Sequence, residues 1–416
     1  MTRIVLLCNV SNSGIRSRLH FRSRMSEWRR RRASEDYGQW NSVAISNISA
    51  WEEVSLTVIF PHYGLKENVQ RFSIDGVDYV CYRPDEDRLI QGPSFRYPRL
   101  RRLVKREIAR IKPDLVHIVG AENPYYSICG LDLPKETPLL VSLQTLLADP
   151  NFLKSYPMPE WAYDFYTKVE RELLQRADWI ATRVEPFREI VRGFVPDARF
   201  ISMSLPVGVD VDLSPCPKEY DFVYFSANLN KAGDHAVEAF AKAWKAFPGI
   251  TLNLSGACDP AYLEQLYSSA QALGCPREAI IYTGPKDTHE EVIAQIRKSR
   301  FALLPLKVDL VSGTIREAMA NGLPVVSSIT KGTPRLNRAR ESLLLAPVGD
   351  TDALAGCMLR LLNPDGPAAM LRENAALTVD ELYSNRHFME MWRLAYRVLA
   401  SGEPLPEELI KNTLVL

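Results

Sequence analysis

The feature that most constrains the fold of this 416-residue sequence is an alternation of short apolar runs with segments of helical periodicity. In the first half the runs RIVLLCNV and LVHIVG lie on either side of the helical stretch PRLRRLVKREIARI. In the second half the runs DFVYFS and FALLPL recur with helical stretches between them. Such alternation predicts parallel sheets covered by helices on both faces, and the length predicts two doubly wound α/β domains.

The segment from Ser204 to Tyr220 is rich in proline and breaks both periodicities, which predicts an interdomain linker. Four parts follow from this interpretation. They are a first Rossmann-like domain at residues 1–206, a linker at 207–219, a second Rossmann-like domain at 220–375, and a helical tail at 376–416 that packs back on the first domain.

Composition excludes several partners. The net charge of +1 gives no global attraction to nucleic acid, and we expect none as a partner. Seven scattered cysteines without a C-x-x-C pair argue against a disulfide framework or a zinc site. No apolar run reaches the roughly twenty residues of a membrane helix, and the N-terminus predicts a strand instead of a signal peptide. A cytoplasmic location is expected.

A local exception to the balanced charge is the stretch from Arg16 to Arg32, with eight arginines and one glutamate. It is either a solvated segment or a basic surface suited to an anionic acceptor or to peripheral contact with the inner face of the cytoplasmic membrane, with RNA as a less favoured partner.

Several catalytic motifs are absent. The sequence lacks G-x-G-x-x-G after its first strand, a P-loop, a G-x-S-x-G elbow and an H-x-x-x-H pair. This disfavours dehydrogenases, NTPases, hydrolases and metalloproteases. Asp210 and Asp212 have the D-x-D form of a metal clamp, but they lie in the predicted linker, so no metal is expected.

The stretch around Glu317 suggests a binding site. An apolar strand at 300–306 is followed by a loop and then by the helical residues TIREAMA. Ligands of parallel sheets bind beyond the carboxyl ends of strands, and helix N-termini favour phosphates. Thr314 and Glu317 also have the spacing of a capping box, so Glu317 is either a helix cap or a ligand contact.

Two polar residues stand out near the apolar run LVHIVG. His117 lies inside this apolar strand, where a histidine is more often a core residue than a catalyst. Glu122 follows the strand in a polar turn at the expected crevice, where a buried carboxylate would be costly without a function.

The stretch LPLKVDLVSGTIREAMANGLPVVSS resembles the signature of the retaining nucleotide-sugar glycosyltransferases of family 4, which have the GT-B architecture. That signature has two glutamates separated by seven residues. Glu317 matches the second, whereas the shorter Asp309 takes the place of the first. SANLNKAGDH resembles the segment that binds the donor pyrophosphate, with Lys231 at the lysine and Asn228 where arginine is usual. DLVHIVGAENPYYS, LLVSLQTLLAD and YGQW are similar to a bacterial branch.

The resemblance implies roles for particular residues. Glu317 would bind the ribose hydroxyls, Lys231 would neutralise the leaving pyrophosphate, and Asp309 would contact the sugar. The implied catalytic residues are Asp309, Lys231 and Glu122. The implied donor-binding residues are Asn228, Lys231, Gly284, Lys286, Val311, Ser312, Gly313, Thr314 and Glu317. The implied acceptor-side residues are Gly38, Trp40, His117, Glu122 and Gln144.

The implied fold is therefore GT-B, with two facing Rossmann-like domains and a C-terminal helix that crosses back to the first. The implied function is retaining transfer of a sugar from a nucleoside-diphosphate sugar to a hydroxyl of a glycan, lipid-linked or small-molecule acceptor, without a cofactor or a metal. Bacterial surface polysaccharide or glycolipid synthesis is the expected setting. A non-catalytic nucleotide-sugar-binding module and, less favoured, a sugar-nucleotide epimerase are the alternatives.

Overall fold

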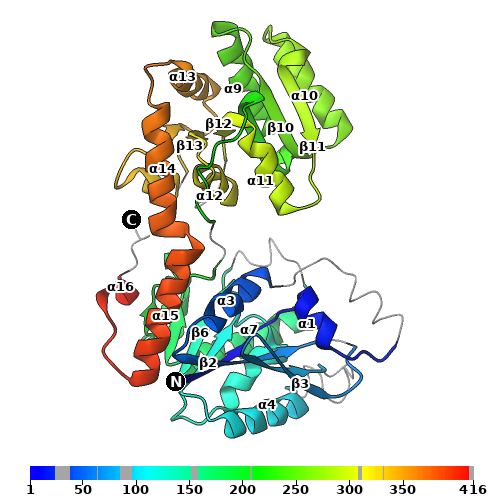
Figure 1. The fold of residues 1–416 in the computed structure, drawn as a ribbon, viewed down its shortest axis with the longest axis vertical. Helices are drawn as coiled ribbons and strands as arrows, with labels where there is room; N and C mark the ends of the chain where they lie inside the picture. Colours follow the sequence, from blue (N-terminus) through cyan, green and yellow to red (C-terminus); the bar gives the residue numbers. More distant parts are fainter. Residues whose placement is uncertain are drawn as a thin grey trace. The chain divides into compact units, whose positions relative to one another are not determined.

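The computed structural model describes residues 1–23, 38–62, 64–84, 96–150, 158–206, 209–307, 312–330 and 332–411. The chain forms two compact units. Unit 1 comprises Met1–Val207 and Phe388–Val415, and unit 2 comprises Gly208–His387. Both are α/β units (Figure 1).

Unit 1 is built on an eight-stranded sheet of order β3-β4-β2-β1-β5-β6-β7-β8, in which only β3 is antiparallel to its neighbour. Its strands are β1 Thr2–Leu7, β2 Val54–Pro61, β3 Val69–Ile74, β4 Val77–Tyr82, β5 Leu115–Val119, β6 Leu139–Ser142, β7 Trp179–Ala181 and β8 Phe200–Ile201. Its helices are α1 Ser13–Arg18, α3 Gln39–Ser49, α4 Pro98–Ile111, α5 Pro124–Ser127, the 3₁₀ helix η2 Ile128–Asp132, α7 Glu160–Arg176, α8 Glu185–Arg192, α15 Asn385–Ser401 and α16 Glu407–Ile410.

The central strands of unit 1 are apolar because helices cover both faces of the sheet. One face packs on α1, α3 and α15, through buried residues such as Ile45 and Trp392. The other packs on α4, α7 and α8, through residues such as Val104 and Leu173. Residues 388–401 therefore belong to the core of unit 1 although they are far from the rest of it in the sequence.

Unit 2 has a fully parallel six-stranded sheet of order β11-β10-β9-β12-β13-β14. Its strands are β9 Tyr220–Asn228, β10 Leu252–Ala257, β11 Ile280–Gly284, β12 Ser299–Leu304, β13 Val325–Ser328 and β14 Leu344–Ala346. Its helices are η3 Leu229–Lys231, α9 Gly233–Ala246, α10 Pro260–Ala272, η4 Arg277–Ala279, α11 His289–Arg297, α12 Gly313–Ala320, η5 Thr333–Asn337, α13 Thr351–Leu362 and α14 Ala368–Tyr383.

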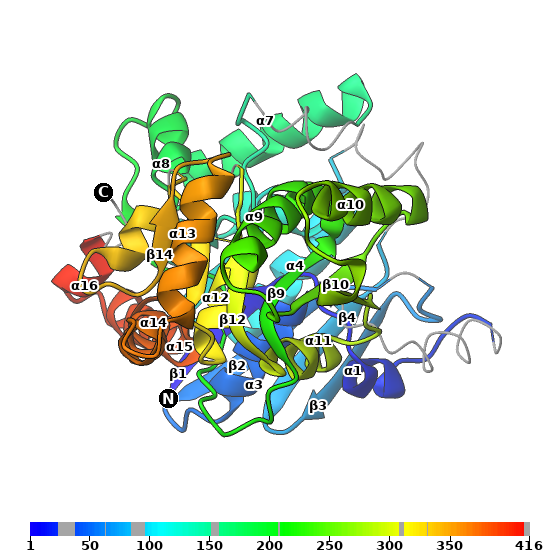
Figure 2. The same ribbon diagram turned by 90° about the horizontal axis from the view of Figure 1, so that it is seen from above.

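The helices of unit 2 form two layers. Figure 2 shows α9, α10 and α13 over one face of the sheet, where α9 packs on both of the others, and α11 and α12 over the opposite face. The strand order reverses between β9 and β12, the two strands in the middle of the sheet. This reversal defines a crevice at their carboxyl ends, where open α/β sheets bind ligands. The α/β class and the two doubly wound sheets expected from the sequence are confirmed.

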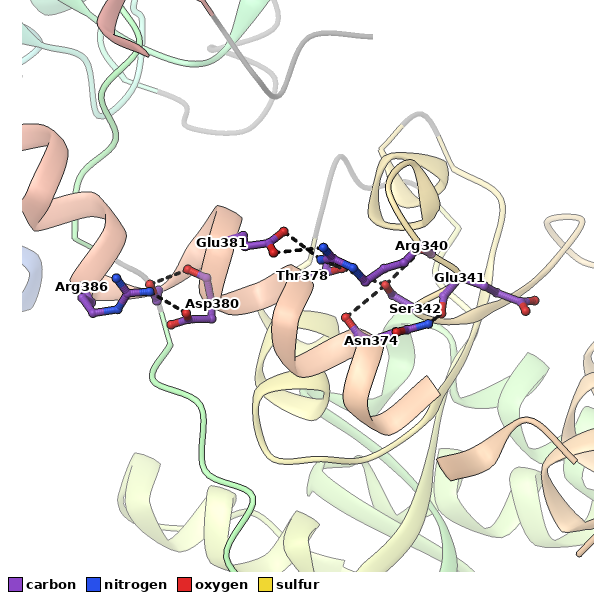
Figure 3. Close-up of polar contacts among 9 residues, drawn as sticks. Arg340, Glu341, Ser342, Asn374, Thr378, Asp380, Glu381 and Arg386 are labelled. Atoms are coloured by element: carbon purple, nitrogen blue, oxygen red, sulfur yellow. Dashed lines mark hydrogen bonds and ion pairs between the residues drawn. The ribbon is translucent and has the colours of Figure 1, made fainter. Parts of the chain in front are cut away.

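The observed units differ from the predicted domains at two places. Residues 209–219 of the predicted linker lie in unit 2, where Asp212 forms an ion pair with Arg297. The sequence pattern ended the second domain at residue 375, whereas residues 376–387 lie in unit 2. The reason is that α14 continues to Tyr383 and is fixed to the loop before β14 (Figure 3). Arg340 donates hydrogen bonds to both carboxylate oxygens of Glu381 at 2.8 and 3.0 Å, and the Ser342 and Thr378 hydroxyls lie 2.9 Å apart.

Candidate active site

The candidate site of unit 2 is a cavity of about 670 Å³ at the carboxyl ends of β9, β10 and β11 and at the N-terminus of α12. Of the residues predicted to bind the donor, it brings together Lys231, Lys286, Ser312, Gly313, Thr314 and Glu317. Its size falls within the range of about 300–1,000 Å³ that is usual for small-molecule sites.

The N-terminus of α12 faces this cavity through Ser312, Gly313 and Thr314. Ser312 is the N-cap, and its hydroxyl accepts a hydrogen bond from the Thr314 amide at 3.3 Å. The helix therefore begins two residues before the predicted capping box would place it. Because Glu317 lies five positions after the cap, the interpretation of Glu317 as a capping-box partner of Thr314 is wrong.

Glu317 is positioned by α12 to face the cavity. Its side chain is 19% exposed, and its Oε1 atom lies 4.0 Å from Nε2 of His289 at the start of α11. Burial raises the pKa of Glu317 above its usual value, and the nearby His289 and Arg316 partly offset this shift. A half-buried carboxylate at the end of a cavity is suited to accept hydrogen bonds from ligand hydroxyls.

The basic residues at the cavity come from two different turns. Lys231 ends η3 directly after β9 and is exposed, and no hydrogen bond or ion pair links it to another described residue. Lys286 follows β11, and its ammonium donates to the Thr283 carbonyl at 2.6 Å. With the positive end of the α12 dipole, these groups make the cavity suited to an anion.

Other predicted donor residues lie elsewhere. Asn228 does not line the cavity, because its side-chain oxygen caps η3 by accepting from the Asn230 amide at 3.0 Å. Gly284 ends β11 beside the cavity-lining residues Pro285 and Lys286 but does not line the cavity itself. Asp309 and Val311 lie outside the described residues.

Gly256 was not predicted and is required by the backbone of this site. It lines the cavity with a φ of +141°, and a Cβ atom at this position would lie 1.9 Å from the carbonyl oxygen of Ser226 on β9. The close approach of these two strand ends therefore depends on a residue without a side chain.

We expect Gly256→Ala to destabilise unit 2 by at least about 1–3 kcal/mol, because the added methyl group must separate the ends of β9 and β10. Gly274→Ala is the matched control, because Gly274 has a φ of +89° and a Cβ atom added there would meet no neighbour within 4 Å. Thermal unfolding of both variants measures the difference. An equal loss of stability in the two variants would show that glycine is required at position 256 for its backbone conformation and not for the close contact with Ser226.

The predicted acceptor-side residues all belong to unit 1. Gly38 has a φ of +73° at the start of α3, and a Cβ atom there would lie 2.2 Å from the Asn9 carbonyl oxygen. Trp40 is partly buried against the core. Gln144 follows β6 and is half-buried.

Glu122 lies in the turn after β5. Burial raises its pKa to about 8, with a smaller contribution from the charge of Glu170. Asn123 donates to its Oε1 atom at 2.9 Å. At neutral pH this side chain is therefore largely protonated and able to donate a hydrogen bond.

Glu170 on α7 was not predicted. Its carboxylate accepts hydrogen bonds from the amides of Leu147 and Ala148, both at 2.9 Å, and burial raises its pKa to about 7. It thereby fixes the loop that follows β6, which contains Gln144. A glutamate inside an apolar helical face is the sequence signal that could have revealed this role.

The acceptor-side interpretation of His117 is not supported, because this residue is completely buried in the core of unit 1. Its Nδ1 and Nε2 atoms lie 2.8 Å from the hydroxyls of Tyr396 and Ser142, and its ring packs on Trp392. Burial lowers its pKa to about 3.

The burial of the His117 side chain in the fold predicts a pH dependence of stability. Its pKa is about 3 in the fold and 6.5 in the unfolded chain. Between these values His117 binds more protons in the unfolded state, so its own contribution to stability falls as the pH falls below 6.5, by about 2 kcal/mol at pH 5. Burial raises the pKa values of Glu122 and Glu170, so these two groups add stability as the pH falls over the same range. The contribution of His117 is therefore measured as the difference between wild type and His117→Gln, from hydrogen exchange of the β5 amides at pH 6.5 and pH 5. The same change of stability with pH in both proteins would contradict the assignment.

The D-x-D pair has a structural explanation at one position. Asp212 forms an ion pair with Arg297 and accepts a hydrogen bond from the Ser214 amide at 2.9 Å.

The basic stretch Arg16–Arg32 is described only up to residue 23, and the remainder lies outside the described residues. Within the parts of the chain that the structure covers, no helix is long and apolar enough to span a membrane.

Comparison with solved structures defines the class of fold. The chain is similar to HepE of Anabaena in complex with UDP, with a TM-score of 0.60, 14% identity and coverage of 96% of this chain and 100% of that one. It is also similar to sucrose-phosphate synthase of Thermosynechococcus elongatus, with a TM-score of 0.56, 18% identity and coverage of 97% and 100%. The fold is thus GT-B, as the sequence predicted.

Sequence comparison then identifies the family resemblance. Residues 220–364 match the family described as glycosyl transferases group 1, which confirms the resemblance found in the sequence. The amylovoran biosynthesis glycosyltransferase AmsK of Erwinia amylovora is 33% identical over 144 residues, which are 33% of each chain. The exopolysaccharide phosphotransferase SCO2592 of Streptomyces coelicolor is 32% identical over 145 residues, 34% of this chain and 14% of that one. The match thus spans about a third or less of the length of these relatives.

Proposed function

We propose that the protein is a retaining glycosyltransferase that transfers a sugar from a nucleoside-diphosphate sugar to an acceptor hydroxyl in the synthesis of a bacterial polysaccharide or glycolipid. The observation that carries this proposal is the cavity of unit 2, which combines Lys231, the N-terminus of α12 and Glu317 at the reversal point of a parallel sheet. The names of both relatives refer to polysaccharides, which supports the setting.

The cavity has groups suited to both the diphosphate and the ribose of a sugar nucleotide. Transfer breaks the bond between the anomeric carbon and the diphosphate oxygen, forms a bond to the acceptor oxygen, and releases the acceptor proton. Negative charge grows on the departing diphosphate, which Lys231 and the α12 amides would stabilise without a metal. Glu317 would accept hydrogen bonds from the ribose hydroxyls, and Asp309 would contact the transferred sugar.

Glu122 would face the acceptor from unit 1. Because burial raises its pKa to about 8, it would enter the reaction protonated and donate a hydrogen bond to an acceptor oxygen. Gly38, Trp40 and Gln144 would shape the acceptor side, whereas His117 has only a core role. A sugar-nucleotide epimerase would be expected to bring histidine and acidic groups to the sugar, and the buried His117 cannot supply such a group.

The proposal is tested by incubating the full chain with a panel of nucleoside-diphosphate sugars and lipid-linked acceptors. UDP-sugars are tested first, because a structural neighbour was solved in complex with UDP. Mass spectrometry detects the glycosylated product, and NMR of its anomeric proton reports whether configuration is retained. Nucleotide binding by calorimetry without product from any acceptor would favour the non-catalytic binding module, and an inverted product would refute retention.

A further inference from the structure

Unit 2 has a second cavity, of about 500 Å³, at the amino ends of the strands of its sheet. It is lined by the starts of β12 and β13, the ends of α11, α12 and α13 and the start of α14, together with residues of the segment that enters the unit. The candidate active site lies at the carboxyl ends of the strands, so the two cavities are separate and lie at opposite ends of α11 and α12.

The charged lining of this second cavity is entirely basic. It contains Lys218, Arg297, Arg300 and Arg372, and no aspartate or glutamate is among the described residues that line it. Two of these cations are compensated from outside the lining: Arg297 forms an ion pair with Asp212, and Arg300 forms one with Asp221 at 2.9 Å.

The other two cations are held only by main-chain carbonyls among the described residues. Lys218 donates to the Arg297 carbonyl at 2.7 Å, and Arg372 donates to the Leu213 carbonyl at 2.9 Å. Partial burial lowers the pKa of Lys218; the nearby Cys216 opposes this shift, and the positive charges of Arg372 and Arg297 add to it. Lys218 and Arg372 are therefore close enough to repel each other, and an anion between them would relieve that repulsion.

The rest of the lining adds a helix terminus and an apolar wall. Ala368 and Ala369 begin the 16-residue helix α14, whose first turn has no side-chain cap and no acidic residue. The positive end of its dipole thus reinforces the basic side chains. The apolar wall is formed by Phe301, Pro324, Leu361 and Leu362.

We propose that this second cavity binds a small phosphorylated molecule with an apolar portion. The phosphate would accept hydrogen bonds from Lys218, Arg372 and the first amides of α14, and the apolar portion would pack on the wall around Phe301. A cavity of this volume suits a molecule of the size of an aryl or short alkyl phosphate. Binding here does not depend on sugar transfer.

The test is calorimetry of the full chain with phenyl phosphate, inorganic phosphate and phenol. Phenyl phosphate is expected to bind one site and to bind at least about tenfold more tightly than either of the other two, since each lacks one of the two recognised features. No saturable binding of phenyl phosphate, or equal affinity for inorganic phosphate, would overturn the proposal.

Matched charge-removing variants locate the binding. Lys218→Met and Arg372→Met are each expected to weaken phenyl phosphate binding at least about tenfold. Lys231→Met, at the candidate active site, and Lys245→Met, on the exposed end of α9 outside both cavities, are expected to leave the affinity unchanged. Loss of binding in Lys231→Met but not in Lys218→Met would place the ligand in the active site and refute the proposal.

A second readout uses Cys216, a free and half-buried thiol that lines the second cavity. Phenyl phosphate is expected to slow alkylation of Cys216 by the neutral reagent iodoacetamide, measured by mass spectrometry. Cys258, a free and half-buried thiol that does not line this cavity, is the internal control. Binding that protects both thiols equally, or neither, would contradict the location.

Discussion

Lys231→Ala is expected to lower the rate constant of sugar transfer by about 10²- to 10³-fold, the loss typical when one preorganised group that stabilises a developing anion is removed. Lys231 lines the cavity and forms no ion pair or hydrogen bond with another described residue, so its charge is available to the departing diphosphate. Because that charge grows as the bond breaks, the loss is expected mainly in kcat.

Steady-state kinetics with the donor identified by the product assay separates this role from simple binding. Lys286→Ala removes a cation of the same cavity, but Lys286 already donates to the Thr283 carbonyl and lies beside β11. It is expected to raise KM more than it lowers kcat. Lys245→Ala, on the exposed end of α9, is the control for loss of charge alone. A Lys231→Ala enzyme with wild-type kcat would remove Lys231 from the mechanism.

The sequence was sufficient to predict the parallel cores. The strands β1, β5, β9 and β12 are continuous apolar runs because helices bury both faces of each sheet, and this pattern is visible without a structure. The family resemblance, in the stretch around Glu317 and in the segments that contain Lys231 and Lys286, extended this prediction to the GT-B fold and to six of the residues that line the cavity of unit 2.

Edge elements were missed because their pattern depends on their neighbours. The antiparallel pair β3 and β4 was not predicted, although its turn contains Asp75 and Gly76, both with positive φ, which is the strongest short hairpin signal. The short β8 has only two residues, too few for any periodicity.

Site details were missed where tertiary contacts decide a residue's role. Asn228 is an exception, because the contact that the sequence pattern did not indicate is local: its side chain caps the 3₁₀ helix η3 that starts there. His117 was assigned to the acceptor although its two ring nitrogens meet hydroxyls from β6 and α15, the second of them 279 residues away in the sequence. Such distant partners leave no local pattern.

Glu317→Gln is expected to weaken binding of the nucleoside-diphosphate donor by about 10- to 100-fold, because each charge-assisted hydrogen bond contributes about 1.5–3 kcal/mol and the amide can accept where the carboxylate did but without its charge. The helix should persist in this variant, since the N-cap of α12 is Ser312 and not part of a box with Glu317. Unchanged thermal unfolding therefore distinguishes a lost ligand contact from a lost cap.

The pH dependence of donor binding provides a second and independent check on Glu317. Burial raises its pKa above that of an exposed glutamate, and only the ionised form would offer a charged oxygen to each of the two ribose hydroxyls. Donor affinity should therefore fall as the pH drops through this raised pKa, a step measured by calorimetry between pH 8 and pH 5 that Glu317→Gln should lack. Glu373→Gln, on the exposed surface of α14, is the control and should keep the step. If wild type and Glu317→Gln have the same pH profile, Glu317 does not bind the donor as a carboxylate.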